Sequence, residues 1–479
     1  MPTKILTYIN RLAWPSILLV EVASFWHFYQ PSFAPYLWWL IIGLTFILSW
    51  RKLEYGLYIM WLELIIGSHG HALLWTINGF DLSIRMGIFI VILILGWWHF
   101  WQQRSWQSWQ NRQPLIWYVW AIIFLLAVVV GLMKFGWQGS WFDWNGYLYW
   151  LLVPIFTLTY SREFILNLWR LLLTGVNWLA IKTFLLLAVF AHQISWLDIS
   201  LLYRWMRDLR LGEITYVSQN YYRIFMPSQI FAVVVWLGIV LLWLNKDQLK
   251  YKFIDNWYIW LSAFAAVSVL LVSWSRSYWL ATIIMTIVLI VYYAYQQKSF
   301  FLLYKVSARV ISISILAILL MFFWTGSFNS GQAMAQRVTN LSEPAASTRI
   351  AQLGPLWQQI RQSPWLGNGF GQTVTYQSDD PRIRTSANPD GWYTTAAFEW
   401  GYLDIWLKMG FWGLVFYLAI ILLILYNKLK NSQNTGLRTL VSKGLAWGLL
   451  AVLIINIFSP YLNHPLGIGL ILINWYQDV

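Results

Sequence analysis

Cysteine is absent from the 479-residue chain. Without it the protein has no disulfide framework, no thiolate nucleophile, no iron–sulfur cluster and no zinc site built on cysteine. The same absence removes the usual sequence marker of the redox compartment.

Charged residues are scarce as well, and this shortage excludes an ordinary soluble protein. Asp, Glu, Lys and Arg make up 10% of the chain, whereas 59% of the residues are hydrophobic. Apolar runs of about 20 residues, the length that crosses a bilayer as a helix, recur along the whole chain. The sequence therefore predicts an all-α, polytopic membrane protein of about thirteen to fourteen transmembrane helices. The expected spans lie near residues 12–28, 35–50, 54–70, 84–100, 115–134, 146–160, 170–192, 224–244, 254–274, 277–295, 307–325, 402–426 and 444–459, with a short apolar piece at 466–475.

The basic residues orient these spans. The net charge of +14 comes from 32 Lys and Arg against 18 Asp and Glu, and the basic residues are dispersed between apolar runs, so no nucleic-acid partner is expected. Lys and Arg collect at the cytoplasmic ends of spans. One set of alternate loops holds eighteen of the 32, and we assign it to the cytoplasm: Lys4, Arg11, Arg51, Lys52, Arg104, Arg112, Arg162, Arg170, Lys246, Lys250, Lys252, Lys298, Lys305, Arg309, Lys428, Lys430, Arg438 and Lys443.

Most of the other basic residues are arginines on the expected outer side. Positive charge is normally sparse there, so this excess predicts an anionic partner, and a planar guanidinium suits phosphate or carboxylate. Phosphate at the outer membrane surface is the first hypothesis. Arg204, Arg207 and Arg210 could instead hold an interfacial helix at the lipid headgroups. The outer arginines are Arg85, Arg204, Arg207, Arg210, Arg223, Arg276, Arg337, Arg349, Arg361, Arg382 and Arg384, and the remaining lysines are Lys134, Lys182 and Lys408.

The 37 tryptophans are far above ordinary usage, and many lie near the ends of expected spans. This placement is typical of an aromatic belt at the membrane surface. The N-terminal residues 1–11 are weakly basic and carry no small-residue cleavage site. We expect them to lead into the first span rather than to form a removed signal peptide.

The pattern divides the chain into five parts. We expect scaffold transmembrane helices at 1–193, an outer amphipathic segment at 194–223, central transmembrane helices at 224–325, a large outer loop with short helices at 326–398, and C-terminal transmembrane helices at 399–479. The amphipathic segment follows from apolar residues at three- and four-residue steps between positions 199 and 209.

The large loop shows internal order. Residues 348–363 predict a helix that is stopped at Pro364 and that Gly354-Pro355 could interrupt. Gly367, Gly369 and Gly371 predict a flexible turn rather than a nucleotide site, because no strand and helix flank them. Asp379-Asp380-Pro381 is interpreted as an exposed turn rather than a metal site.

Several charged residues lie at the membrane edge. Arg276, in a tight connection between two long spans, should have a counter-ion. Glu399 could serve as a base or pair with an Arg, and both hypotheses stay open. Asp404 and Lys408, at i and i+4, should pair with each other. His69 and His71 are interpreted as surface residues, and Glu21, Glu63 and Lys182 could belong to a transport path or to a structural network.

From about Tyr222 to Ile420 the chain resembles the O-antigen ligase and O-antigen polymerase superfamily of bacterial envelope enzymes. The resemblance depends on the order and the spacing of four motifs. Two departures are notable: Glu399 stands where many ligases carry His, and Trp357 comes later after Arg349 than is usual. The motifs are an Arg-containing start of a span at 222–229, a Ser-Arg start of a span at 275–280, Ser347-Thr-Arg349 followed by Trp357, Pro364, Gly367 and Gly369, and a closing motif of Glu399-Trp-Gly-Tyr-Leu403 with Gly410-Phe-Trp-Gly413.

The resemblance implies glycan transfer from an undecaprenyl-diphosphate-linked donor to a hydroxyl acceptor. It places the enzyme in the cytoplasmic (inner) membrane as a multi-pass protein with its large loop on the periplasmic side, and it requires no cofactor and no metal, in agreement with the absence of an Asp-x-Asp pair. It implies catalytic roles for Arg276 and Arg349 on the diphosphate and for Glu399 as the base. Substrate binding is expected from Arg223, Tyr222, Tyr278, Arg361 and Tyr402. We expect Arg276, Arg349 and Glu399 to converge near the outer membrane surface.

Two other classes of function remain open at this point. A transporter of an inorganic anion or small solute would use the intramembrane charges, although transporters usually place their site between internal repeats and no clear repeat is seen in the sequence. A lipid-binding scaffold without chemistry is the third class. The glycosyltransferase is favoured.

Overall fold

The computed structural model describes residues 2–103, 114–159, 161–218, 220–246, 257–326, 344–380, 383–430 and 436–475, with side chains described in these ranges except at 2–11, 162, 218 and 344–346. The chain divides into two compact units, and each is described by itself. Unit 1 comprises Met1–Arg104, Pro154–Ala333 and Asn431–Ala451, and unit 2 comprises Ser105–Val153, Met334–Lys430 and Val452–Val479.

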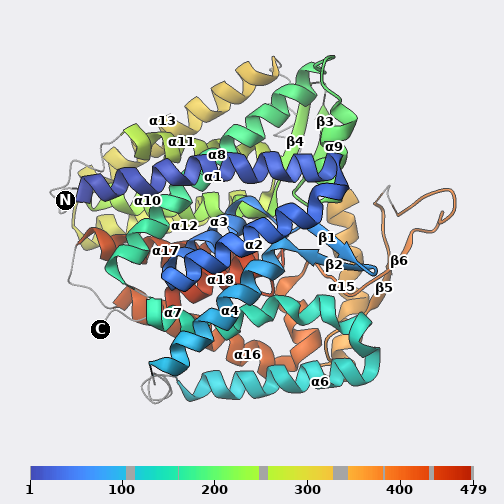
Figure 1. The fold of residues 1–479 in the computed structure, drawn as a ribbon. Helices are drawn as coiled ribbons and strands as arrows, with labels where there is room; N and C mark the ends of the chain where they lie inside the picture. The colour runs from blue at the N-terminus through green and yellow to red at the C-terminus, as the bar shows by residue number, and fades with distance from the viewer. Residues whose placement is uncertain are drawn as a thin grey trace. The chain divides into compact units, whose positions relative to one another are not determined.

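Unit 1 is built around one helix that is apolar on every side. All fifteen residues of α10 (Ile230–Leu244) are buried, as expected for a helix without a polar face. It packs against α8, α11, α12 and α13, and α8 also lies beside α1, as Figure 1 shows. The other elements have these bounds: α1 Pro2–Tyr29, η1 Pro31–Phe33, α2 Ala34–Arg51, α3 Leu53–Ile66, α4 Ile84–Gln102, α7 Val153–Thr159, α8 Arg162–His192, α9 Ile199–Asp208, η3 Pro227–Gln229, α11 Trp257–Ser273, α12 Arg276–Gln296, α13 Phe300–Thr325 and α17 Leu437–Ile455, the last turn of which belongs to unit 2.

Side-chain caps fix the starts of four helices in unit 1. Ser83 accepts from the backbone of Met86, and Ser161 accepts from that of Phe164. Asp198 and Ser299 cap α9 and α13 in the same way. Each cap satisfies a backbone N–H that has no partner within its own helix, which is why these helices begin where they do.

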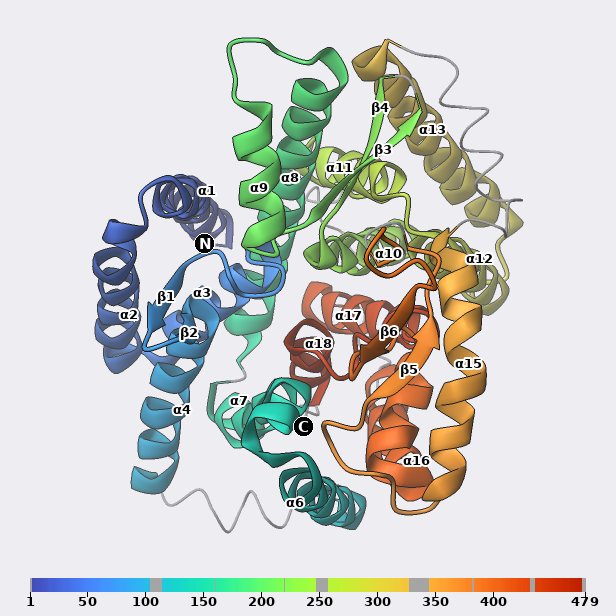
Figure 2. The same ribbon diagram turned by 90° about the vertical axis from the view of Figure 1, so that its right-hand side faces the viewer.

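Unit 2 holds the large loop and the C-terminal helices. Helix α15 (Pro344–Gln362) packs against α16 (Gly401–Lys430) and against the β5–β6 hairpin (Val374–Gln377 and Trp392–Thr395), as Figure 2 shows. Leu356, Ile360 and Leu407 are fully buried and form the core of this layer. The other elements are α6 Leu115–Trp144, η2 Asn145–Leu152 and α18 Pro465–Trp475.

The structure confirms an all-α, multi-pass membrane protein. Nine helical stretches within the described ranges are long and apolar enough to cross a membrane, and Trp257–Ser273 and Pro465–Trp475 are shorter apolar helices. The nine are Pro31–Arg51, Ile84–Gln102, Leu115–Thr159, Glu163–His192, Pro227–Leu244, Arg276–Gln296, Phe300–Thr325, Gly401–Lys430 and Leu437–Ile455.

One predicted span has a different internal structure. The expected helix at 146–160 is a 3-10 helix, Asn145–Leu152, followed by the seven-residue α7. Pro154 lies in the first turn of α7, where its missing N–H costs nothing, so a new helix starts there instead of the old one continuing.

Three two-stranded hairpins accompany the helices in the described part of the chain. They are β1–β2 (Leu74–Ile77 and Phe80–Ser83), β3–β4 (Glu213–Ser218 and Tyr221–Phe225) and β5–β6. All three fall in connections that the distribution of Lys and Arg assigns to the outer side. These hairpins were not predicted from the sequence.

Candidate functional site

The two candidate residues of unit 2, Arg349 and Glu399, are brought together by the fold. Arg349 lies on α15, and Glu399 lies two residues before α16 begins. The Nε of Arg349 donates to Oε2 of Glu399 in an ion pair. The two side chains are 33% and 43% exposed, so the pair lies at a surface that a ligand can reach. Glu399 therefore has the Arg partner that was one of its two open hypotheses.

Helix α15 runs without interruption through Gly354-Pro355. Gln352 and Leu356, on either side of the proline, are both buried, and the amide of Gln352 donates to the hydroxyl of Tyr376 at 2.9 Å. These anchors keep the helix continuous despite the backbone hydrogen bond that a proline lacks. Burial raises the pKa of Tyr376, so the hydroxyl that accepts from Gln352 stays protonated.

The three glycines after α15 form a closely packed loop rather than a flexible turn. Gly367, Gly369 and Gly371 all have positive φ angles, between 78° and 95°, which glycine adopts without strain. A Cβ on Gly369 would lie 2.7 Å from the backbone N of Gly131 on α6, so a side chain would separate the loop from that helix. The glycines thus allow backbone to pack directly on backbone.

The loop is held by a break in α16. Gly410 has a non-helical backbone (φ 72°), which frees carbonyl groups of the preceding turn. The backbone N–H of Asn368 donates to Leu407 O at 2.7 Å, and that of Gly369 donates to Lys408 O at 3.1 Å. In return, the N–H of Phe411 donates to Pro364 O at 2.9 Å. The groups released by the break are therefore satisfied by the loop.

Lys408 is the centre of a buried polar cluster next to this loop. It pairs with Asp404 at 2.5 Å, as the i, i+4 spacing predicts, and it also pairs with Asp143 of α6. Its Nζ donates to the carbonyl of Ala396 at 3.1 Å, three residues before Glu399. Lys408 thus ties the segment that carries Glu399 to α6 and α16. Asp143 could not be linked to Lys408 from the sequence, because it lies far from Lys408 in the chain.

In unit 1, Arg223 and the connection that carries Arg276 are in contact. Arg276 is the first residue of α12 and is half-buried. The Nε of Arg223 donates to the carbonyl of Ser273 in the same connection at 3.0 Å, and its guanidinium lies 3.6 Å from Glu213. Arg223 therefore contacts the short turn that carries Arg276, the other site arginine that the sequence predicts in this unit. Their convergence with Arg349 and Glu399 stays a prediction.

The three tyrosines expected to bind substrate are engaged within their own units. Tyr222 packs against Phe190 and its hydroxyl accepts from the amide of Gln193 at 3.2 Å. Tyr278 is fully buried, with its hydroxyl 3.3 Å from the carbonyl of Pro227. The hydroxyl of Tyr402 donates to the carbonyl of Leu453 at 2.6 Å.

Other outer arginines have carboxylate partners. Arg207 pairs with Asp208 at 2.7 Å, and Arg384 pairs with Asp379 at 3.2 Å. Arg361 is exposed, and its guanidinium lies 5.7 Å from the ring centre of Trp357. Eight sequence-predicted positions lie outside the described residues, namely Arg104, Arg112, Lys250, Lys252, Arg337, Pro381, Arg382 and Met1, as do the side chains of Lys4, Arg11 and Arg162.

The intramembrane charges form ion pairs. Lys182 pairs with Glu21 at 2.8 Å. Arg85 pairs with Glu63 at 2.7 Å, and both side chains are only 7% exposed. Buried charges that are paired and hydrogen-bonded are typical of a structural network, which favours that hypothesis over a transport path.

His71, on the connection after α3, lies near two arginines, Arg85 and Arg210. Burial, together with the positive charges of Arg210 and Arg85, lowers its pKa to about 4. The imidazole is therefore neutral at physiological pH.

The comparisons with known proteins bear on this arrangement. Residues 261–418 match the family described as O-antigen ligase, which confirms the resemblance seen in the motifs. The matched segment contains Arg276, Arg349 and Glu399. No curated protein matches the chain. The family supports glycan transfer in cell-envelope polysaccharide biosynthesis by a multi-pass, glycosyltransferase-type membrane enzyme.

Proposed function

We propose, from the O-antigen ligase match over residues 261–418, that the protein transfers a glycan from an undecaprenyl-diphosphate-linked donor to a hydroxyl acceptor at the outer face of the cytoplasmic membrane. The observation that carries the proposal is the ion pair between Arg349 and Glu399 at an accessible surface. It sets a cation suited to phosphate beside a carboxylate suited to proton abstraction.

The reaction requires little covalent chemistry from the protein itself. The acceptor hydroxyl attacks the anomeric carbon, the bond from that carbon to the diphosphate oxygen breaks, and the lipid diphosphate leaves with the electron pair. Charge develops on the diphosphate, and fixed cations stabilise it most effectively when they are held in place beforehand. We assign Arg349 and Arg276 to the diphosphate, with Arg223 as a third contact. Glu399 takes the proton of the acceptor hydroxyl.

The ion pair suggests an order for these events. In the ion pair, the Nε of Arg349 and the Oε2 of Glu399 are occupied by each other. A diphosphate offers more charge and more acceptor oxygens than a carboxylate, so it displaces Glu399 from the guanidinium. Donor binding then frees the base, and the acceptor is deprotonated only when a donor is present.

The testing experiment is incubation of the purified protein in liposomes with a lipid-linked oligosaccharide, followed by analysis of the products. A longer lipid-linked chain identifies a polymerase, and a glycan on a different acceptor identifies a ligase. Absence of any transferred glycan, with both a lipid-linked and a separate glycan acceptor supplied, would contradict the proposal.

A further inference from the structure

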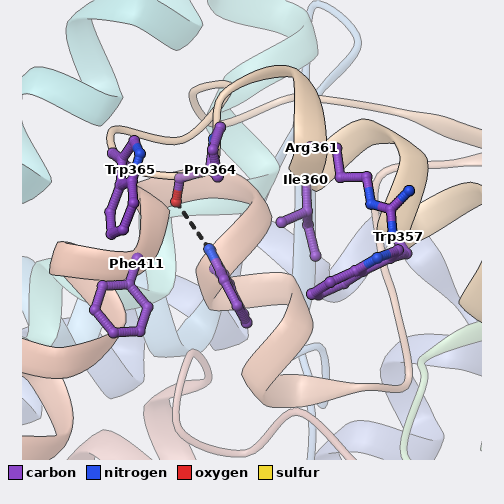
Figure 3. A pocket seen from close by; sticks show the side chains of 7 residues that line it. Trp357, Ile360, Arg361, Pro364, Trp365 and Phe411 are labelled. Atoms are coloured by element: carbon purple, nitrogen blue, oxygen red, sulfur yellow. Dashed lines mark hydrogen bonds between the residues drawn. The ribbon is translucent and has the colours of Figure 1, made fainter.

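A cavity of about 300 Å³ opens beside the loop that follows α15. Trp357, Ile360 and Arg361 line it from the last turns of α15, and Trp406 and Phe411 line it from α16 on either side of the break. Pro364 and Trp365 complete the wall, as Figure 3 shows. We call this cavity the tryptophan groove.

The walls of the tryptophan groove are almost entirely carbon. The indole N–H of Trp406 is already used, because it donates to the carbonyl of Pro364 at 2.9 Å (dashed in Figure 3). The one charged group in the lining is Arg361, whose guanidinium stacks over Trp357. A sugar subsite needs several polar groups that fix the ring's hydroxyls, and this lining offers few. An apolar chain fits it better.

The surroundings indicate the depth of the groove in the bilayer. Phe411 begins the long apolar part of α16, and Lys428 and Lys430 lie at its opposite end, where basic residues mark the cytoplasm. Trp365, in the wall of the groove, is 58% exposed, and Leu366, next to it, is 70% exposed. Exposed tryptophan beside an arginine is typical of the boundary between headgroups and hydrocarbon. The groove is therefore expected to open toward the lipid of the outer leaflet.

The groove and the Arg349–Glu399 pair are both formed by α15 and by the chain at the start of α16. Trp400 contacts the backbone of Arg349, and Trp406 contacts Trp357 and Pro364, so the start of α16 follows α15 in the same direction. Along α15, eight residues separate Arg349 from Trp357, which corresponds to about 12 Å. A chain attached to a diphosphate at Arg349 covers this distance with a few isoprene units.

We propose that the tryptophan groove binds early isoprene units of the donor's polyprenyl chain, those that follow the few units leading from the diphosphate, and so selects the lipid carrier. This proposal builds on the function proposed above, because it takes the donor diphosphate to lie at Arg349. The groove binds the chain through apolar contact with the aromatic rings, and Arg361 holds the face of Trp357 in place.

Binding can be tested without transfer. A sugar-free polyprenyl diphosphate with a photoreactive diazirine in an early isoprene unit is added to the protein in nanodiscs and irradiated, and labelled peptides are identified by mass spectrometry. We expect labelling within residues 357–366 and 406–412, reduced by excess unlabelled polyprenyl diphosphate. Labelling elsewhere overturns the proposal. The proposal is also overturned if a diazirine phospholipid labels the groove equally and polyprenyl diphosphate fails to displace it.

A kinetic test uses chain length. The wild-type protein should prefer a long-chain donor to a short-chain donor in kcat/KM, and Trp365→Ala should reduce that preference about tenfold, as expected when one aromatic contact with the chain is lost. Trp392→Ala, a 55% exposed tryptophan of β6 outside the groove, is the matched control and should keep the preference. An unchanged preference for the long-chain donor in Trp365→Ala contradicts binding of the polyprenyl chain in the groove. Labelling of the groove without any glycan transfer would support binding of the polyprenyl chain in the groove and would contradict only the proposed function.

Discussion

The indole N–H of Trp400 donates to the backbone carbonyl of Arg349 at 2.9 Å, so the residue next to Glu399 binds the helix that carries the ion-pair partner of Glu399. The relative position of Glu399 and Arg349 is thus fixed by a backbone contact as well as by their charges.

Glu399→Gln should lower kcat for glycan transfer by about 10²- to 10⁴-fold, because the amide cannot accept the acceptor's proton. Glu399→His should retain part of the activity, since imidazole can serve as a base. Initial rates with a lipid-linked oligosaccharide measure both. Asp390→Asn, which removes an exposed carboxylate from the same segment, serves as the control. A fully active Glu399→Gln would show that Glu399 is not the base.

Arg349→Ala and Arg276→Ala should each lower transfer by about 10²-fold or more, because each removes a cation from the developing charge of the diphosphate. The assay is again the initial rate of transfer, with folding checked by gel filtration in detergent. Arg384→Ala removes an exposed arginine paired with Asp379 and should transfer glycan at the wild-type rate. Normal transfer by either of the first two variants would show that the diphosphate binds elsewhere.

If Arg276 and Arg349 act on the same diphosphate, their effects should not add. Arg276→Lys and Arg349→Lys keep the charge but lose the planar fork, so each leaves activity that can be measured. The double variant should differ from the sum of the two by at least about 0.5 kcal/mol in activation free energy. Additive losses would indicate that the two arginines serve separate steps.

Lys408→Met should destabilise the protein by about 3–5 kcal/mol, because it leaves Asp143 and Asp404 buried without their cation. Thermal unfolding in detergent measures the change as a lower Tm. Lys134→Met is the control: this lysine is exposed and contacts only a backbone carbonyl in the described structure, so its effect should stay within about 0.5 kcal/mol. Equal Tm values for the two variants would contradict the role of Lys408.

The lowered pKa of His71 predicts a dependence of stability on pH. The unfolded chain binds a proton at this residue below about 6.5, whereas the folded protein binds it only near pH 4. The stability contributed by neutral His71 is therefore complete above 6.5 and falls as the pH drops toward 4. Tm measured across this range should fall less steeply in His71→Gln than in the wild type, with a constant difference at pH 7.5–8.5. Parallel curves throughout would contradict the shift.

Local patterns in the sequence predicted the features that depend on local geometry. The i, i+4 spacing gave the pair of Asp404 with Lys408, and the three- and four-residue steps gave α9. The turn of β1–β2 also had a signal that was missed. Asn78 and Gly79 both have positive φ angles, and Asn-Gly is the preferred dipeptide for such a hairpin turn.

Features that depend on distant parts of the chain could not be predicted. Asp143 is 265 residues from Lys408, and no periodicity links them. The glycines at 367–371 were expected to give flexibility because their close partners, Gly131 and Gly410, lie on other elements. Burial and packing by remote segments decide such positions, so they become visible only in the fold.

The break at Gly410 also has a mechanical consequence. Because the loop after α15 occupies the carbonyls of Leu407 and Lys408, α16 cannot straighten unless the loop lets go. The long apolar part of α16 and the segment that carries Glu399 are therefore expected to move together as one bent unit. A change in bilayer thickness that tilts the apolar part of α16 is therefore expected to shift the segment that carries Glu399 as well.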